Sequence, residues 1–304
     1  MTLLFEQLLN GLQFGTMIFL IAAGLTLVFG IMGVINLAHG SLYMIGAFVA
    51  ATAAGRGAPF VAAVAAGAVA AGLAGIVMEV VVIRRLYRRE HLDQVLATFA
   101  LILIANDGVS MIWGKVPLPV DVPAALHGAV PLGGFAYPAY RLVLIAAGLL
   151  VALGLYLLIS RTRLGMLIRA GATHRETVAA LGVDIARLNT VVFGVGALLA
   201  GLAGALLAPI IAVQVGMGEQ ILILTFVAIV VGGLGSIRGA FVGALLVGLV
   251  DTLGRAYLPV VLKPVARPEL ADSLGGGLSA IAIYLLMAIV LVWKPRGLFP
   301  AGSR

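Results

Sequence analysis

Carboxylates inside apolar segments are the side chains of this sequence best placed to do chemistry. Three of them stand in or beside long apolar runs: Glu79, Asp107 and Asp251. A charge is costly in hydrocarbon, so such a group is expected to pair with a cation or to mark a functional site. Because Arg84 and Arg85 follow Glu79 closely, we expect Glu79 to pair with them at the inner end of its segment.

The other two carboxylates differ in their sequence neighbours. Arg255 follows Asp251 by four residues, which places both on one helix face and predicts an ion pair. Asp107, with its neighbour Asn106, has no local partner, and we expect Asp107 to reach water near the outer end of its segment.

The sequence offers little for covalent or metal chemistry. It contains no cysteine, which excludes disulfides and thiolate metal sites. The histidines fall on different segments without metal-ligand spacing; they are His39, His91, His127 and His174. No phosphate-binding loop ends in Gly-Lys-Ser/Thr, because the lysines are Lys115, Lys263 and Lys294. We expect no catalytic and no metal-binding residues, and a nucleotide-driven step would need another polypeptide.

The composition is that of an integral membrane protein. Hydrophobic residues make up 62% of the 304 residues and charged residues 10%, against roughly 25% charged residues in a soluble domain. The apolar residues form blocks of about 20 residues, the length of a membrane helix, and not shorter alternating strands. The expected fold is an all-α, polytopic helical bundle of about 8–9 transmembrane segments in one domain over residues 1–304. The net charge of +7 comes from basic residues scattered between spans, so we expect no nucleic-acid binding.

The order of apolar and basic segments predicts a topology. Apolar length places helices near residues 8–30, 34–54, 58–83, 92–113, 139–160, 188–212, 221–234, 239–256 and 277–293. Alternate connections hold thirteen of the nineteen basic residues: Arg84, Arg85, Arg88, Arg89, Arg161, Arg163, Arg169, Arg175, Arg187, Arg238, Lys294, Arg296 and Arg304. Since basic loops stay in the cytoplasm, we expect the N-terminus outside and the C-terminus inside.

Residues 28–48 form an apolar stretch with a polar, glycine-rich middle. Gly33 and Gly40 weaken a helix there, and Asn36 and His39 are polar groups that lipid would not favour. A broken helix that faces protein or a water-filled path explains this pattern best. For His39, packing against a neighbouring helix is the simpler expectation, and a role in a path is the alternative.

A second irregular segment lies at residues 221–234. It is shorter than the roughly 20 residues of a full span, so we expect a half-helix. Paired interruptions in the two halves of a membrane chain are typical of a transport path. We therefore predict a substrate path lined by Asn36, His39, Gly40, Ser41, Gly232, Gly233 and Gly235.

The most polar internal connection, residues 161–188, contains a short helix. Thr173 followed by Glu176 predicts a capping box at its start, and Gly182 predicts a left-handed cap at its end. A helix of about two turns is too short to be stable alone, so it must dock on this chain or on another subunit. Val178 and Leu181 offer an apolar face for either partner.

Small residues recur at every fourth position in three segments, which predicts close helix packing. The rows are Gly67, Ala71 and Gly75; Gly196, Ala200 and Gly204; and Ala240, Ala244 and Gly248. Two outer connections, at residues 114–138 and 257–276, are expected to be loops. Prolines should make the first one irregular and stiff.

Four stretches, in order along the chain, share a pattern with a known family. They are GLTLVFGIMGVINLAHGSLYMIGAF from Gly24, SRTRLGMLIRAGATHRETVAALGVDIARLN from Ser160, VVGGLGSIRGAFVGALLVG from Val230 and WKPRGLF from Trp293. The pattern resembles that of permease subunits of branched-chain amino-acid ABC importers, of the LivH type. Related permeases serve branched-chain or other hydrophobic amino acids, urea or amides, so the substrate stays open.

The resemblance implies a multi-pass subunit of the bacterial inner membrane that works by alternating access. It implies a second related permease, two ATPase subunits that bind ATP and Mg, and a periplasmic substrate-binding protein. The chain itself would then be no enzyme and would hold no cofactor. A self-sufficient ion-gradient-driven transporter is the alternative from another class, and it would need a carboxylate relay that we do not find.

The resemblance also implies which residues contact the ATPase. It places the coupling helix in the loop at residues 161–188. The contact residues would be Thr173, Glu176, Val178, Ala179, Ala180, Leu181 and Gly182.

Overall fold

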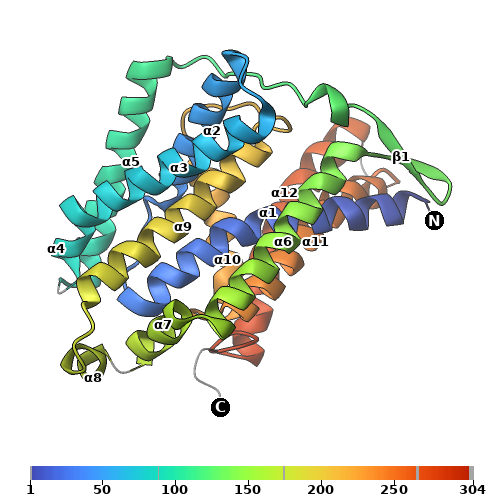
Figure 1. Ribbon diagram of the computed structural model, residues 1–304. Coiled ribbons are helices and arrows are strands. Elements are labelled where there is room, and N and C mark those ends of the chain that lie inside the picture. Colours follow the sequence, from blue (N-terminus) through green and yellow to red (C-terminus); the bar gives the residue numbers. More distant parts are fainter. Residues whose placement is uncertain (1, 88, 174, 265–266, 301–304) are drawn as a thin grey trace. The chain divides into compact units, whose positions relative to one another are not determined.

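The chain folds almost entirely into helices in the computed structural model (Figure 1). The structure describes residues 2–87, 89–173, 175–264 and 267–300. The α-helices are α1 (Thr2–Met32), α2 (His39–Gly55), α3 (Phe60–Met78), α4 (Arg84–Leu86), α5 (His91–Trp113), α6 (Ala139–Arg161), α7 (Arg163–Thr173), α8 (Arg175–Ala180), α9 (Ile185–Leu207), α10 (Met217–Gly232), α11 (Ile237–Leu262) and α12 (Pro268–Trp293). The other elements are a π-helical turn, η1 (Glu79–Ile83), a 3-10 turn, η2 (Ala124–Leu126), and strands β1 (Ala129–Leu132) and β2 (Phe135–Pro138).

Seven helical stretches among the described residues are long and apolar enough to cross a membrane. They are α1, the stretch from α3 to α4, α5, α6, α9, α11 and the part of α12 from Leu274. Two further predicted segments are shorter helices, α2 with 17 residues and α10 with 16. Every predicted segment therefore falls on a helix, and the polytopic all-α fold is confirmed. The orientation of the termini stays a prediction.

The prediction of an outer loop at residues 257–276 is wrong for most of its length. α11 continues through Pro259 to Leu262, and α12 begins at Pro268. A proline at the first helical position loses no hydrogen bond, because the N–H there has no partner within the helix. Pro268 therefore starts a helix where composition predicted an irregular connection.

The connection at residues 114–138, predicted to be an irregular outer loop, is also more regular than predicted. It contains an antiparallel hairpin in which Val130 of β1 lies opposite Tyr137 of β2. Gly133 and Gly134 form its turn with φ of +56° and +111°, which only glycine adopts easily. Prolines are tolerated here because each strand has a single neighbour and leaves one edge unpaired.

The contacts divide the chain into two compact units. The first unit comprises Met1–Ala22, Ala124–Leu149 and Leu224–Arg304, and the second comprises Ala23–Pro123 and Leu150–Ile223. The helices α1, α6 and α10 each contribute residues to both. The prediction of a single domain over residues 1–304 stays a prediction.

Glycines let the helices of the second unit approach closely. A Cβ on Gly46 of α2 would overlap the backbone of Gly201 in α9, and one on Gly67 of α3 would overlap the carbonyl of Gly46. Figure 1 shows α3 and α9 side by side, where Gly75 faces Ala197. The contacts of Gly67 and Gly75 confirm the first predicted packing row. A Cβ on Gly204 would overlap the Tyr43 carbonyl of α2, as the second row predicts.

In the first unit the third row packs α11 against α1. A Cβ on Gly248 would lie 2.5 Å from the Gly15 nitrogen and 2.7 Å from the Gly11 oxygen. Phe19 meets Phe241 edge-on one to two turns further along, with ring centroids 5.0 Å apart. The predicted seam through Ala240, Ala244 and Gly248 is thus a helix contact.

Candidate functional site

The polar interruption predicted at residues 28–48 is a break between α1 and α2. α1 ends at Met32, and Gly33 turns the chain with a φ of +65°. Asn36 lies in the connection, is fully buried, and accepts a hydrogen bond through Oδ1 from the Ala38 backbone N–H at 3.0 Å. The expectation of a broken helix shielded from lipid is therefore confirmed.

His39 opens α2 and packs where α1 passes α9. The side chain is fully buried. A Cβ on Gly24 would lie 2.9 Å from His39 Nε2 and 2.5 Å from the Gly196 oxygen, so neither helix has room for a side chain there. This geometry is that of a packing residue. A contact of His39 with substrate stays a prediction.

The next two residues of the predicted path lie against the start of α10. Gly40 and Gly218 touch through their backbones, and a Cβ on either would overlap the carbonyl group of the other. Ser41 is 3% exposed. The first turns of α2 and α10 therefore meet within the second unit.

The glycines predicted at the second interruption end α10 in the first unit. Gly233 and Gly235 have φ of +110° and +79°, so the chain leaves the helix through them. The carbonyls of Val231 and Gly232 accept hydrogen bonds from the backbone N–H groups of Leu298 and Phe299, at 2.9 and 2.8 Å. The terminal WKPRGLF stretch thus satisfies the open end of α10, and Gly233 provides the space for it. A role of these glycines in a path stays a prediction.

The short helix of the internal connection is α8, with the longer α7 before it. Gly182 has a φ of +87°, Val183 N donates to Val178 O at 3.3 Å, and Gly182 N donates to Ala179 O at 3.0 Å. These two bonds form a Schellman motif. The prediction that Gly182 caps this helix is confirmed.

The predicted start of that helix is wrong. Thr173 closes α7, and its hydroxyl donates to the Arg169 carbonyl at 3.0 Å, one turn back. A threonine that bonds to the preceding turn is inside a helix and not at the N-cap of the next one. The position before α8 is residue 174, which lies outside the described residues.

α8 presents its two apolar side chains differently. Val178 is 6% exposed, whereas Leu181 is 79% exposed. The prediction left open whether the helix docks on its own chain or on a partner. Val178 packs against the chain, and Leu181 leaves an apolar side chain free for a partner.

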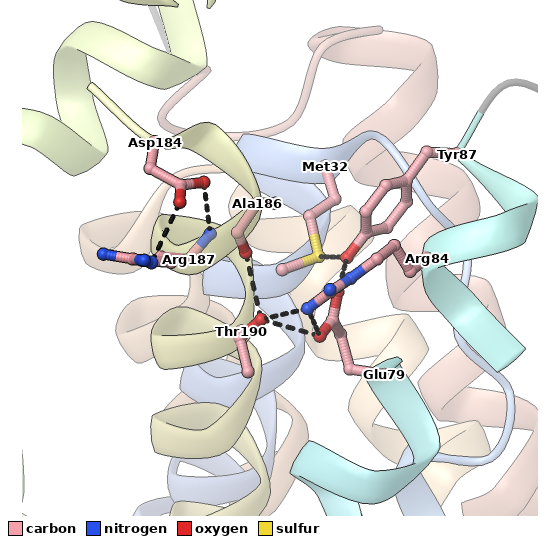
Figure 2. Close-up of polar contacts among 8 residues, drawn as sticks. All are labelled: Met32, Glu79, Arg84, Tyr87, Asp184, Ala186, Arg187 and Thr190. Carbon is pink, nitrogen blue, oxygen red and sulfur yellow. Dashed lines mark hydrogen bonds and ion pairs between the residues drawn. The ribbon is translucent and has the colours of Figure 1, made fainter. Parts of the chain in front are cut away.

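Glu79 directly follows α3 and lies in a network that sequence reasoning found only in part (Figure 2). The predicted ion pair forms, with Arg84 Nη2 2.9 Å from Glu79 Oε2. The Tyr87 hydroxyl donates to Oε1 at 2.6 Å, and the Thr190 hydroxyl donates to Oε2 at 2.8 Å. Glu79 is fully buried, so these donors replace its water.

The network joins α9 to the end of α3. Thr190 belongs to α9, and Arg84 Nη2 donates to its oxygen at 2.6 Å. Glu79 begins the π-helical turn η1, a local irregularity that is frequent at functional sites. Burial raises the pKa of Tyr87, and its hydrogen bond to Glu79 acts in the same direction, so the phenol stays a donor.

A pocket of about 630 Å³ lies between this network and α8. Its lining combines basic, acidic and small side chains: Arg84, Arg85, Tyr87, Glu176, Ala179, Ile185, Ala186 and Asn189. The predicted coupling residues Glu176 and Ala179 thus share a pocket with Arg84.

The first unit holds the other predicted ion pair. Arg255 Nε lies 2.8 Å from Asp251 Oδ1, as the four-residue spacing predicts. A pocket of about 410 Å³ adjoins this pair and is also lined by Asn10 and Arg141, which are hydrogen-bonded to each other. Most of the side chains that line this pocket are polar.

Asp107 is exposed, and its neighbour Asn106, which has no partner nearby in the sequence, has one further along the chain. Its Nδ2 donates to Glu219 Oε1 at 2.6 Å, across 113 residues of sequence. Sequence reasoning missed Glu219. The available signal was a carboxylate in the first turn of a short apolar helix, directly after Gly216 and Gly218.

Comparison with known proteins gives a consistent set of relatives. The family described as "Branched-chain amino acid transport system / permease component" matches residues 7–292. The high-affinity branched-chain amino acid transport system permease protein BraD of Pseudomonas aeruginosa is 31% identical over 306 residues, which cover 96% of this chain and 94% of BraD. The corresponding permease protein LivH of Escherichia coli is 31% identical over 314 residues, with the same coverage of 96% and 94%.

More distant similarity extends to an archaeon. A probable branched-chain amino acid transport permease protein LivH of Methanocaldococcus jannaschii is 27% identical over 266 residues, which cover 83% of this chain and 82% of that protein. No solved structure gives a significant match.

Proposed function

The chain belongs to the family of permease components of branched-chain amino acid transport systems, and from this membership we propose that it forms part of the membrane path of an ATP-driven importer. The match over residues 7–292 carries this conclusion, because it covers nearly all the described helices. The chain is a multi-pass membrane protein and a transport component, not itself an enzyme. The resemblance found in the sequence is thereby confirmed. The substrates that we propose are leucine, isoleucine and valine.

The energy for transport comes from other subunits in this proposal. The sequence has no Gly-Lys-Ser/Thr loop, so we assign ATP and Mg to two ATPase subunits. A second, related permease completes the path, and a periplasmic substrate-binding protein delivers the amino acid. These partners are what an importer permease of this family needs.

We assign the ATPase contact to α8 and its flanks. The exposed Leu181 inserts into a groove of the ATPase, while the buried Val178 ties α8 to this chain. The remaining contact residues that we propose are Thr173, Glu176, Ala179, Ala180 and Gly182. Movement of α8 then reaches α9 and α3 through the pocket and the bonds among Glu79, Arg84 and Thr190.

We assign the substrate path in the second unit to the break before α2. Asn36, His39 and Ser41 are polar groups in an otherwise apolar surrounding, and Gly40 brings α10 close to them. Weak polar contacts of this kind suit transport, because tight binding would slow release. In the first unit, Gly232, Gly233 and Gly235 let the end of α10 adjust as the path opens alternately to each side.

Purification of the tagged chain from membranes tests the assembly. We expect two ATPase chains and a second permease to copurify, and ATP hydrolysis in the complex to rise when loaded binding protein is added. The runner-up function, an ion-gradient-driven transporter, requires leucine flux from the chain alone in liposomes without ATP. That flux would overturn the proposal.

A further inference from the structure

One polar pair in the second unit has no role in helix packing or in the coupling network. It consists of Asn106 on α5 and Glu219 in the first turn of α10. Asn106 Nδ2 donates to Glu219 Oε1 at 2.6 Å. This bond uses one oxygen of the carboxylate and the donor side of the amide.

Two acceptors of this pair are buried and have no hydrogen-bond partner among the residues that the structure describes. They are Glu219 Oε2 and Asn106 Oδ1. None of the ion pairs between described residues includes Glu219. Turning the amide round would set Oδ1 against a carboxylate oxygen, so the bond to Oε1 fixes its orientation. Two buried acceptors in one hydrogen-bonded pair need a donor, and a cationic donor would also compensate the charge of the carboxylate.

The position of the pair relates it to the proposed path. Gly218, directly before Glu219, packs on Gly40 at the start of α2. Gly216 also lies near the carboxylate, because a Cβ there would be 3.7 Å from Glu219 Oε2. Glu219 is therefore the next residue along α10 from the contact with the start of α2.

We propose that Glu219 and Asn106 bind the α-ammonium group of the amino acid as it passes the start of α2; this rests on the proposed function. An ammonium has three N–H donors and no acceptor, so it can bond to Glu219 Oε2 and Asn106 Oδ1 together. The bond to the carboxylate is charge-assisted, which makes it the stronger of the two. Urea and simple amides carry no positive charge, so the pair favours amino acids over them.

The substitution Glu219→Gln separates this role from a structural one. The new amide can accept from Asn106 Nδ2 and donate to Asn106 Oδ1, so the pair satisfies itself without a ligand. We expect the variant to fold and assemble at least as stably as the wild type. A residue that only supports the structure would then tolerate this change.

The experiment measures ATP-driven uptake of radiolabelled L-leucine by the whole importer in proteoliposomes, with its binding protein outside. Losing a charge-assisted hydrogen bond weakens the affinity for the ligand by about tenfold or more. We expect leucine uptake by Glu219→Gln to fall by about tenfold or more, while its thermal unfolding and basal ATP hydrolysis match the wild type. Glu219→Asp keeps the charge and should retain more uptake. Asp107→Asn removes an exposed carboxylate next to Asn106 and should leave uptake unchanged.

The two proposals fail in different ways. If the wild type takes up no leucine, the proposed function is wrong. If the wild type takes up leucine and the uptake by Glu219→Gln is within about twofold of it, the proposed function stands and the ammonium site is wrong. Water alone would then satisfy the two acceptors of the pair. Where Glu219→Gln unfolds, Glu219→Asp decides. It keeps both the charge and Asn106, so leucine uptake lower than that of Asn106→Ala would contradict a role for the carboxylate.

Discussion

At the residue scale, buried polar groups of this protein depend on partners from distant parts of the chain. Glu79 has no exposed surface, and its oxygens receive donors from Arg84, Tyr87 and Thr190. Removing one partner of such a group leaves an uncompensated charge, which costs more than the bond itself gains.

Arg84→Ala should therefore destabilise the protein. Arg84 is 38% exposed in its side chain, so water can replace part of the lost contact, and we expect a lower unfolding temperature without complete loss of the fold. The measurement is thermal unfolding of the purified protein. Arg85→Ala is the matched control, since Arg85 is exposed and contributes no bond to Glu79 in the described network. Equal unfolding temperatures for the two variants would contradict the role of Arg84.

Gly24→Ala should destabilise the crossing of α1 and α9. Its Cβ would lie 2.5 Å from the Gly196 oxygen, and overpacking of this kind costs about 1–3 kcal/mol. Gly108→Ala is the control, because Gly108 lies in α5 with open space around it. That change should stabilise the helix by up to about 1 kcal/mol. Thermal unfolding checks both, and a stable Gly24→Ala protein would disprove the close contact.

At the element scale, α8 is a short helix held at its C-terminal end. The Schellman motif at Gly182 and the buried Val178 fix it to the chain, while Leu181 points away. A helix of 6 residues has little stability of its own, so these contacts decide whether it persists.

Leu181→Gln and Val178→Ala should therefore affect different properties: the first ATPase association, the second the stability of α8. Leu181→Gln removes an apolar contact with the ATPase in this proposal, so we expect the ATPase to associate about tenfold more weakly. Hydrogen exchange in α8 should stay unchanged. Val178→Ala removes two methyl groups, worth about 1–2 kcal/mol, and should speed exchange in α8 about tenfold. Pull-down of the ATPase and hydrogen–deuterium exchange measure the two effects. Normal ATPase association in Leu181→Gln would remove α8 from the coupling contact.

Local patterns predicted the elements of this fold well. The break at Gly33, the short α10, the cap at Gly182 and the pair of Asp251 with Arg255 follow from glycine conformation and four-residue spacing. The helical structure at residues 257–276 was not predicted. Prolines are common in loops, so the sequence does not distinguish a loop from a helix that contains Pro259 or begins at Pro268.

At the scale of the whole molecule, partners far apart in sequence could not be predicted. Thr190 reaches Glu79 across 111 residues, and Glu219 reaches Asn106 across 113. Such pairs depend on how helices pack, which composition and periodicity do not determine. Each unit is built around close backbone contacts at glycine, and these contacts set which polar groups meet.

The central claim is that this permease imports branched-chain amino acids with energy from ATP. The most direct measurement is uptake of radiolabelled leucine into proteoliposomes that contain the whole complex, with ATP inside and binding protein outside. We predict accumulation that requires ATP and is not matched by urea. Uptake of urea without leucine, or leucine uptake that is the same without ATP, would contradict the account.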